Sequence, residues 1–186
     1  MLKMRLEKTP LRLLNLDLLV CLSLLLIVLS CNSTPPGGLS EKGELQIGLV
    51  CSNLDRSLDF YKNVIGMQET GGFEVDGQFS TDAALSDGKA FKVRTLKLDN
   101  APGGTTLKLA CCSDSTVTAR QKFVNETPGV KYLTFEVPSA KGIRERLQQR
   151  GIPLLGKTPV DMGEGTELIM VNDPDGVFVE IIGKRD

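Results

Sequence analysis

Hydrophobic and polar residues alternate from Leu45 to Val50, and this two-residue period predicts a strand. The next segment places hydrophobic residues on one helical stripe, at Leu54, Leu58, Tyr61 and Ile65. Ser52 or Asn53 can cap this helix by accepting a backbone N–H. Gly66 follows the helix where a left-handed residue can end it. The segment therefore predicts a strand, a capped turn and an amphipathic helix.

Three more strands are expected before residue 112. The pattern predicts a weak strand near Phe73, followed by a loop rich in Gly, Ser and Asp. A strand from Phe91 to Leu98 comes next, and a turn at 100–104 leads into a strand from Thr105 to Cys111.

The second half of the chain repeats this order. A strand from 131 to 137 precedes a helix that Ser139 can cap, with Ile143 and Leu147 on its inner face and Gly151 at its end. Strands are then predicted near Leu154, at 167–171 and at 177–182, with a turn at 173–176 between the last two. The recurring sequence of strand, cap, helix and glycine indicates a duplicated module.

The phrase NLDRSLDFYKNVIGM at 53–67 closely resembles the opening of the vicinal oxygen chelate superfamily. That group holds the glyoxalases, extradiol dioxygenases, fosfomycin-modifying enzymes and bleomycin-binding proteins. The resemblance implies an α+β fold of two βαβββ modules, at about 45–112 and 130–183, whose curved mixed sheets pair around one cleft. It identifies a fold and not a reaction, because this fold hosts many chemistries.

The resemblance also implies that four side chains face the cleft, namely Gln46, Lys108, Tyr132 and Glu180. Glu180 matches the final glutamate of the family and would be the base if the protein were an enzyme. Gln46 and Glu180 could bind a metal, whereas cationic Lys108 repels a divalent ion and the phenol of Tyr132 is a poor ligand. The chain also has no histidine. We therefore expect no metal or other cofactor, with a Lys108–Glu180 ion pair in the metal's place, and a divalent metal is the alternative.

The N-terminus is typical of a bacterial lipoprotein. A basic segment precedes an apolar run from Leu18 to Leu29, which has the length of a signal-peptide core and falls short of the ~20 residues of a membrane span. The run ends in a sequence that resembles a lipobox, Val28-Leu29-Ser30-Cys31. This predicts a signal peptide over 1–30 and a lipid such as palmitate on Cys31. An ordinary signal peptide or an uncleaved anchor is the alternative.

Residues 31–44 are rich in Pro, Gly and Ser and predict a flexible linker before a domain at 45–186. We therefore expect a protein of the cell envelope, on its periplasmic or extracellular face, that touches the membrane only through its lipid. The 22 Lys and Arg residues form no basic cluster against 23 Asp and Glu residues, which disfavours nucleic acid as a partner. The cysteines Cys51, Cys111 and Cys112 are expected to be buried apolar thiols, with a Cys51–Cys111 disulfide as the alternative.

The leading interpretation is a membrane-tethered domain, similar to bleomycin-resistance proteins, that binds a small molecule in the cleft without a metal and without turning it over. A metal-dependent lyase or isomerase resembling glyoxalase I (lactoylglutathione lyase) is the alternative, and a protein-interaction module of the cell envelope is the second alternative. The sequence leaves open whether the modules pair within one chain or swap between the chains of a homodimer.

Overall fold

The computed structural model describes residues 44–99, 104–112 and 120–186. The predicted signal peptide, the lipid site at Cys31 and nearly all of the linker lie outside these residues. No helix in the described part of the chain is long and apolar enough to cross a membrane.

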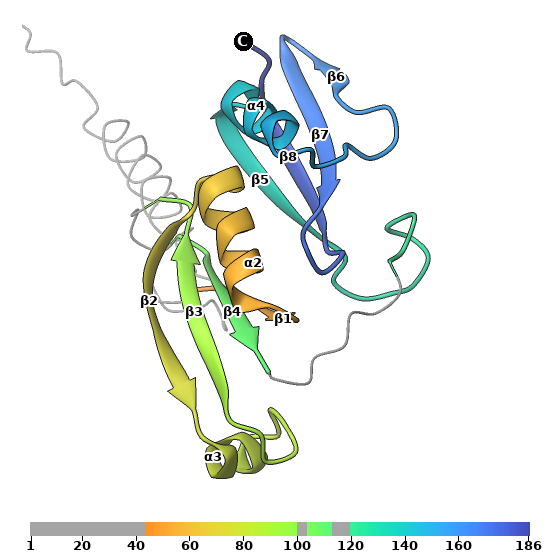
Figure 1. The fold of residues 1–186 in the computed structure, drawn as a ribbon. Helices are drawn as coiled ribbons and strands as arrows, with labels where there is room; N and C mark the ends of the chain where they lie inside the picture. The colour runs from red at the N-terminus through yellow and green to blue at the C-terminus, as the bar shows by residue number, and fades with distance from the viewer. Residues whose placement is uncertain (1–43, 100–103, 113–119) are drawn as a thin grey trace, which may run out of the picture. The chain divides into compact units, whose positions relative to one another are not determined.

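Two four-stranded mixed sheets form the fold (Figure 1). The first sheet has the order β1-β4-β3-β2 and consists of β1 (Gln46–Cys51), β2 (Gln68–Val75), β3 (Phe91–Lys97) and β4 (Thr106–Cys111). The second has the order β5-β8-β7-β6 and consists of β5 (Tyr132–Ser139), β6 (Val160–Gly163), β7 (Thr166–Asn172) and β8 (Phe178–Lys184). In each sheet the first and last strands of the module pair in parallel and the other pairs are antiparallel. The predicted α+β fold with a repeated βαβββ order is therefore confirmed.

The first module's helix has two parts, α2 (Leu54–Asp59) and a wider π-helical continuation, η1 (Phe60–Ile65). Asn53 is the cap, because its side chain accepts a 2.9 Å hydrogen bond from the Arg56 backbone N–H. Gly66 ends the helix with a φ of 103°, as predicted. The wider turn was not predicted, and it places a compact set of side chains in the core, Phe60, Tyr61, Val64 and Ile65.

The second module's helix, α4 (Lys141–Gln149), buries Ile143 and Leu147 as predicted. Figure 1 shows α2 lying across the first sheet and α4 across the second. The buried apolar side chains of η1 and α4 belong to one continuous hydrophobic core, in which the rings of Tyr61 and Phe135 lie 6.5 Å apart. The two modules are thus held together by shared apolar burial.

Two sequence predictions of local structure were wrong. The loop after β2 contains a short helix, α3 (Gly77–Asp82), which the Asp76 side chain caps by accepting from a backbone N–H. No strand forms near Leu154, and the edge strand is β6, several residues later. Pro153 cannot donate to a strand ladder, and Gly156 has a left-handed φ of 63°, so the chain turns where a strand was expected.

Candidate functional site

A groove of about 880 Å³ runs between β1 of the first module and β5 of the second. Its lining includes both Gln46 and Tyr132, so the structure brings together two of the four side chains assigned to the cleft. Apolar side chains from both modules make up much of its surface, including Leu45, Ile47, Leu49, Val130, Leu133 and Phe178. The groove therefore offers a hydrophobic surface with a few polar groups.

Tyr132 is half-exposed, at 50% of its surface, and it lines a second hollow as well. This smaller hollow, of about 380 Å³, is formed by β1, β4 and β5 and includes Leu107 and Phe135. Ile47 and Leu133 also line both hollows. The phenol ring thus lies where the two hollows adjoin, at the first residue of β5.

Lys108 lies on the same sheet face as Gln46, and Glu180 lies on the same sheet face as Tyr132. Both charged residues are one strand further from the groove. Gln46 is paired with Thr106, and alternation along β4 puts Lys108 on that face. Tyr132 is paired with Phe178, and alternation along β8 puts Glu180 on the same face as Phe178 and Tyr132. Neither charged residue is among those that line the groove.

The predicted Lys108–Glu180 ion pair was wrong. The Glu180 carboxylate accepts a 2.7 Å hydrogen bond from the Thr134 hydroxyl on the neighbouring strand β5. The Lys108 ammonium lies 6.0 Å from the centre of the Phe73 ring. Within the described residues no ion pair joins the two charges. Glu180 is only half-buried, so a hydroxyl and solvent can satisfy it without an opposite charge.

The residues at these four positions do not fit the divalent metal that the resemblance suggests. Gln46 and Glu180 carry ligand oxygens, but Gln46 lines the groove and Glu180 does not. No cluster of three or more His, Cys, Asp or Glu residues able to hold a metal ion occurs in the described ranges. The ammonium of Lys108 would also repel a cation placed on its sheet face.

Charged groups lie around the groove. Glu44, next to β1, accepts hydrogen bonds from the Thr106 hydroxyl and from the Lys97 ammonium, the latter at 3.2 Å. These bonds lower the pKa of Glu44, and the bond from Thr106 has the largest effect. Glu44 is therefore ionised at neutral pH. In the lining of the groove, Lys131 donates a 3.2 Å bond to the Gln121 side chain. Glu44 is not among the residues that line the groove, so a ligand there would meet the cationic Lys131 beside β5.

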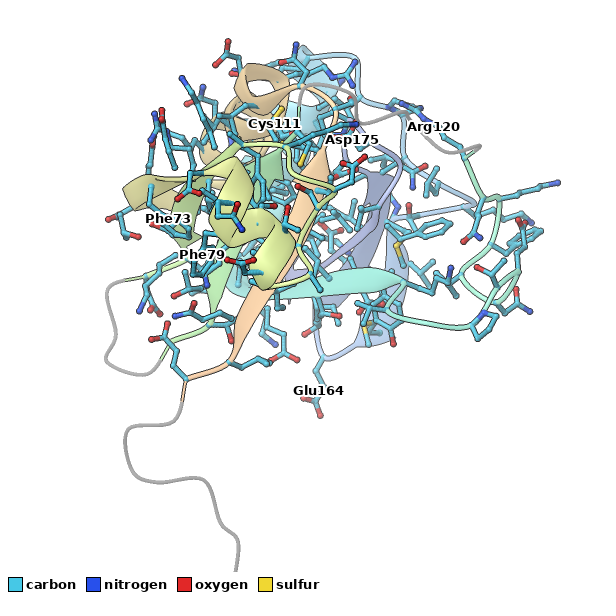
Figure 2. The ribbon with its side chains drawn as sticks, turned by 90° about the horizontal axis from the view of Figure 1, so that it is seen from below. Phe73, Phe79, Cys111, Arg120, Glu164 and Asp175 are labelled. Carbon is cyan, nitrogen blue, oxygen red and sulfur yellow. The ribbon has the colours of Figure 1, made fainter. Side chains whose placement is uncertain are left out.

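The turn after β7, Asp173–Gly176, joins the second module to the helix of the first. The Asp175 carboxylate accepts bonds from the Ser52 backbone N–H at 3.2 Å, from the Ser52 hydroxyl and from the Ser57 hydroxyl at 3.3 Å. The Arg56 guanidinium approaches the same carboxylate at 3.4 Å. Figure 2 labels both Asp175, on this turn, and Cys111, at the end of β4.

The neighbouring carboxylate of Asp173 is buried and accepts three hydrogen bonds. The Tyr61 hydroxyl donates at 2.9 Å, and the backbone N–H groups of Asp175 and Val177 donate at 2.9 and 2.8 Å. Burial raises the pKa of Asp173. The pKa of Tyr61 is raised well above its ordinary value, mainly by burial and secondly by the nearby Asp173 carboxylate.

Sequence reasoning predicted the turn but missed this junction. Ser52 was interpreted as a possible helix cap, whereas its side chain contacts a residue of the other module. The signal that could have revealed the contact is the pair of carboxylates in a turn directly after a buried strand. The junction matters to the groove because β1, which forms one wall, leads directly into Ser52.

Comparison with known proteins agrees with this architecture. The sequence model of the Glyoxalase/Bleomycin resistance protein/Dioxygenase superfamily matches residues 45–181. The chain therefore belongs to that superfamily. A search of curated protein sequences gives no match.

Solved structures with the same fold come from distant relatives. A glyoxalase family protein from Bacillus cereus is 17% identical, with a TM-score of 0.65, over 81% of this chain and 99% of that one. The trypanothione-dependent glyoxalase I of Leishmania major is 18% identical, with a TM-score of 0.55, over 76% and 86%. A glyoxalase/bleomycin resistance protein/dioxygenase domain from Frankia sp. is 21% identical, with a TM-score of 0.54, over 80% and 95%. Identities this low establish the fold alone.

Proposed function

We propose that the protein binds a small molecule in the groove between β1 and β5 without using a metal. The observation that carries this proposal is the groove itself, about 880 Å³ with Gln46 and Tyr132 in its lining. Ligand sites for small molecules typically have volumes of roughly 300–1,000 Å³ and are mainly apolar with a few polar groups. The four positions that would hold a metal in the family carry a donor set that does not fit one.

The character of the groove favours one class of ligand. The apolar side chains of both modules and the half-exposed ring of Tyr132 favour a flat hydrophobic body. The Gln46 amide and the Lys131 ammonium provide hydrogen bonds at its edges. The ligand is therefore a mainly hydrophobic small molecule with polar groups at its ends.

Catalysis by a lyase or isomerase is the second candidate. It is favoured by Glu180, a half-buried carboxylate on the same sheet face as Tyr132. The Thr134 hydroxyl already binds this carboxylate, and Glu180 does not line the groove. Turnover that disappears in Glu180→Gln while ligand binding persists would support the enzyme over the binding protein.

A thermal-shift screen of the purified domain against hydrophobic small molecules tests the binding proposal. We expect a ligand that raises the melting temperature, and we expect Tyr132→Ala to weaken its binding by about tenfold, equivalent to ~1.4 kcal/mol. Phe79→Ala is the matched control, because Phe79 is an exposed aromatic residue on α3 outside the groove. Equal affinity in Tyr132→Ala and wild type would contradict a site in this groove.

We also propose that a lipid on Cys31 anchors the domain to the cell envelope, with no other membrane contact. The basic N-terminal residues, the short apolar run and the lipobox-like sequence support this proposal. Cys31→Ser should release the protein from the membrane fraction or leave it unprocessed. A Cys31→Ser protein that still carries lipid would show that the anchor lies elsewhere.

A further inference from the structure

Cys51 and Cys111 end two neighbouring strands of the first sheet. Cys51 is the last residue of β1, Cys111 is the last residue of β4, and the two are direct partners in the parallel register. Neighbouring strands lie about 4.8 Å apart. That spacing falls in the Cα separation of roughly 4.4–6.8 Å that disulfides span. Partner residues on parallel strands also extend to the same face of the sheet.

The two thiols lie beside each other in a buried environment. Cys51 is only 2% exposed, and its side chain interacts with that of Cys111. The pKa of Cys51 is raised to about 12, mainly by burial and secondly by the neighbouring Cys111. Cys111 is half-buried, and both residues are in the thiol form. Cys111 is thus the partner that a dissolved reagent reaches more easily.

We propose that Cys51 and Cys111 form a reversible dithiol–disulfide site that small-molecule disulfides oxidise. The Cys111 thiolate attacks the reagent, forms a mixed disulfide with one half and releases the other half as a thiolate. The Cys51 thiol then loses its proton, attacks the Cys111 sulfur and displaces the second half. The two cysteine sulfurs are oxidised, the reagent is reduced to two thiols, and the two protons pass to those thiolates.

Register selects this pair over the sequence neighbours. Cys51 and Cys111 are direct partners in the ladder, whereas Cys112 follows the last residue of β4 and is not part of this ladder. The predicted bond therefore joins two strands across the sheet, although a bond between adjacent cysteines would have the shorter loop.

The bond would act on the junction between the modules. Cys51 directly precedes Ser52, whose backbone and hydroxyl bind Asp175 of the second module. Linking β1 to β4 fixes the strand end that carries this contact. It also constrains the unfolded chain over the long segment between the two cysteines, which stabilises the folded state.

Peptide mapping of the full chain tests the site. The protein is incubated with hydroxyethyl disulfide while folded, its remaining thiols are alkylated, and it is digested with trypsin. Cleavage after Lys and Arg places Cys51 in peptide 43–56 and both Cys111 and Cys112 in peptide 109–120. We expect these two peptides to be linked, and fragmentation of the linked pair to place the bond on Cys111.

Two matched variants complete the test. Cys112→Ser should retain the linked peptides, and Cys111→Ser should lose them while keeping its circular dichroism spectrum. The oxidised wild type and the oxidised Cys112→Ser variant should melt at a higher temperature than their reduced forms, and dithiothreitol should reverse the shift. The proposal is overturned if the folded wild type yields no linked peptides, or if fragmentation places the bond on Cys112. Fragmentation of the wild type decides the matter even if Cys111→Ser fails to fold.

Discussion

The hydroxyl of Tyr61 in the first module donates a 2.9 Å hydrogen bond to the buried carboxylate of Asp173 in the second. Tyr61 is completely buried, and its ring also packs against Phe60 in an edge-on arrangement with centroids 5.1 Å apart. The bond joins the core of one module to the turn that carries Asp175 of the other. Together with the contacts of Asp175, it holds the two modules in register with each other.

Tyr61→Phe should destabilise the protein by about 1.5–3 kcal/mol, because it removes a hydrogen bond to a buried carboxylate. Urea denaturation gives the free energy of unfolding directly. Tyr132→Phe is the matched control, since Tyr132 is the other tyrosine of the chain and is half-exposed. It should change stability by less than ~0.5 kcal/mol. Equal effects of the two substitutions would show that the Tyr61–Asp173 bond contributes nothing.

The stability of the wild type relative to Asp173→Asn should depend on pH with a defined sign. Burial raises the pKa of Asp173, so the folded protein binds a proton that the unfolded chain has released. The contribution of this carboxyl to stability is therefore fully present below the unfolded pKa of about 3.9 and is lost as pH rises through the higher folded pKa. Urea denaturation of both proteins between pH ~3 and ~7 measures the difference. A wild-type advantage that grows with pH would contradict this assignment.

The Ser52–Asp175 contact should show strong energetic coupling. In a double-mutant cycle of Ser52→Ala and Asp175→Ala, we expect a coupling energy of about 1–3 kcal/mol, because the Ser52 hydroxyl donates to the Asp175 carboxylate in a partly buried junction. The bond from the Ser52 backbone N–H persists in Ser52→Ala and does not enter this coupling. The exposed Lys62–Glu69 ion pair, at 2.7 Å, is the control and should couple by less than ~1 kcal/mol. Additive effects at Ser52 and Asp175 would mean that the turn does not hold the modules together.

Two arginines that contact Glu167 should differ in importance. The Glu167 side chain is only 2% exposed and contacts Arg144 closely, whereas Arg185 approaches it at 3.5 Å and is half-exposed. Arg144→Met should destabilise by about 2–3 kcal/mol, because it leaves a buried carboxylate without its nearest partner. Arg185→Met should cost less than ~1 kcal/mol. Thermal and urea unfolding measure the stability of the two variants. A larger loss in Arg185→Met than in Arg144→Met would contradict the observed geometry.

The elements that local sequence determines were predictable. The strand, a cap at Ser52 or Asn53 and the left-handed Gly66 follow from spacing and residue type within one short segment, and the structure selects Asn53. The repeat of that pattern predicted the second module and thus the fold. The π-helical turn of η1 was not predictable from periodicity, because the stripe of hydrophobic residues is nearly the same for both helix types over so few residues.

The contacts of the site were less predictable, because they join residues far apart in the chain. Asp175 and Ser52 lie 123 positions apart, and each residue also has a plausible local role in a turn or a cap. The Lys108–Glu180 pair was inferred from family positions, but each side chain finds its neighbour within its own sheet. Gln46 and Tyr132, the other two of these positions, both line one groove.

The central claim is that the groove binds its ligand without a metal, and calorimetric titration of the ligand from the thermal-shift screen tests it most directly. Titrations are made after dialysis against EDTA and again after addition of Ni²⁺ or Zn²⁺. We expect the same dissociation constant, within about twofold, under all three conditions, because the Gln46, Lys108, Tyr132 and Glu180 positions offer no cluster of metal ligands. Binding that is lost in EDTA and restored by either ion would contradict the claim and favour the metal-dependent enzyme.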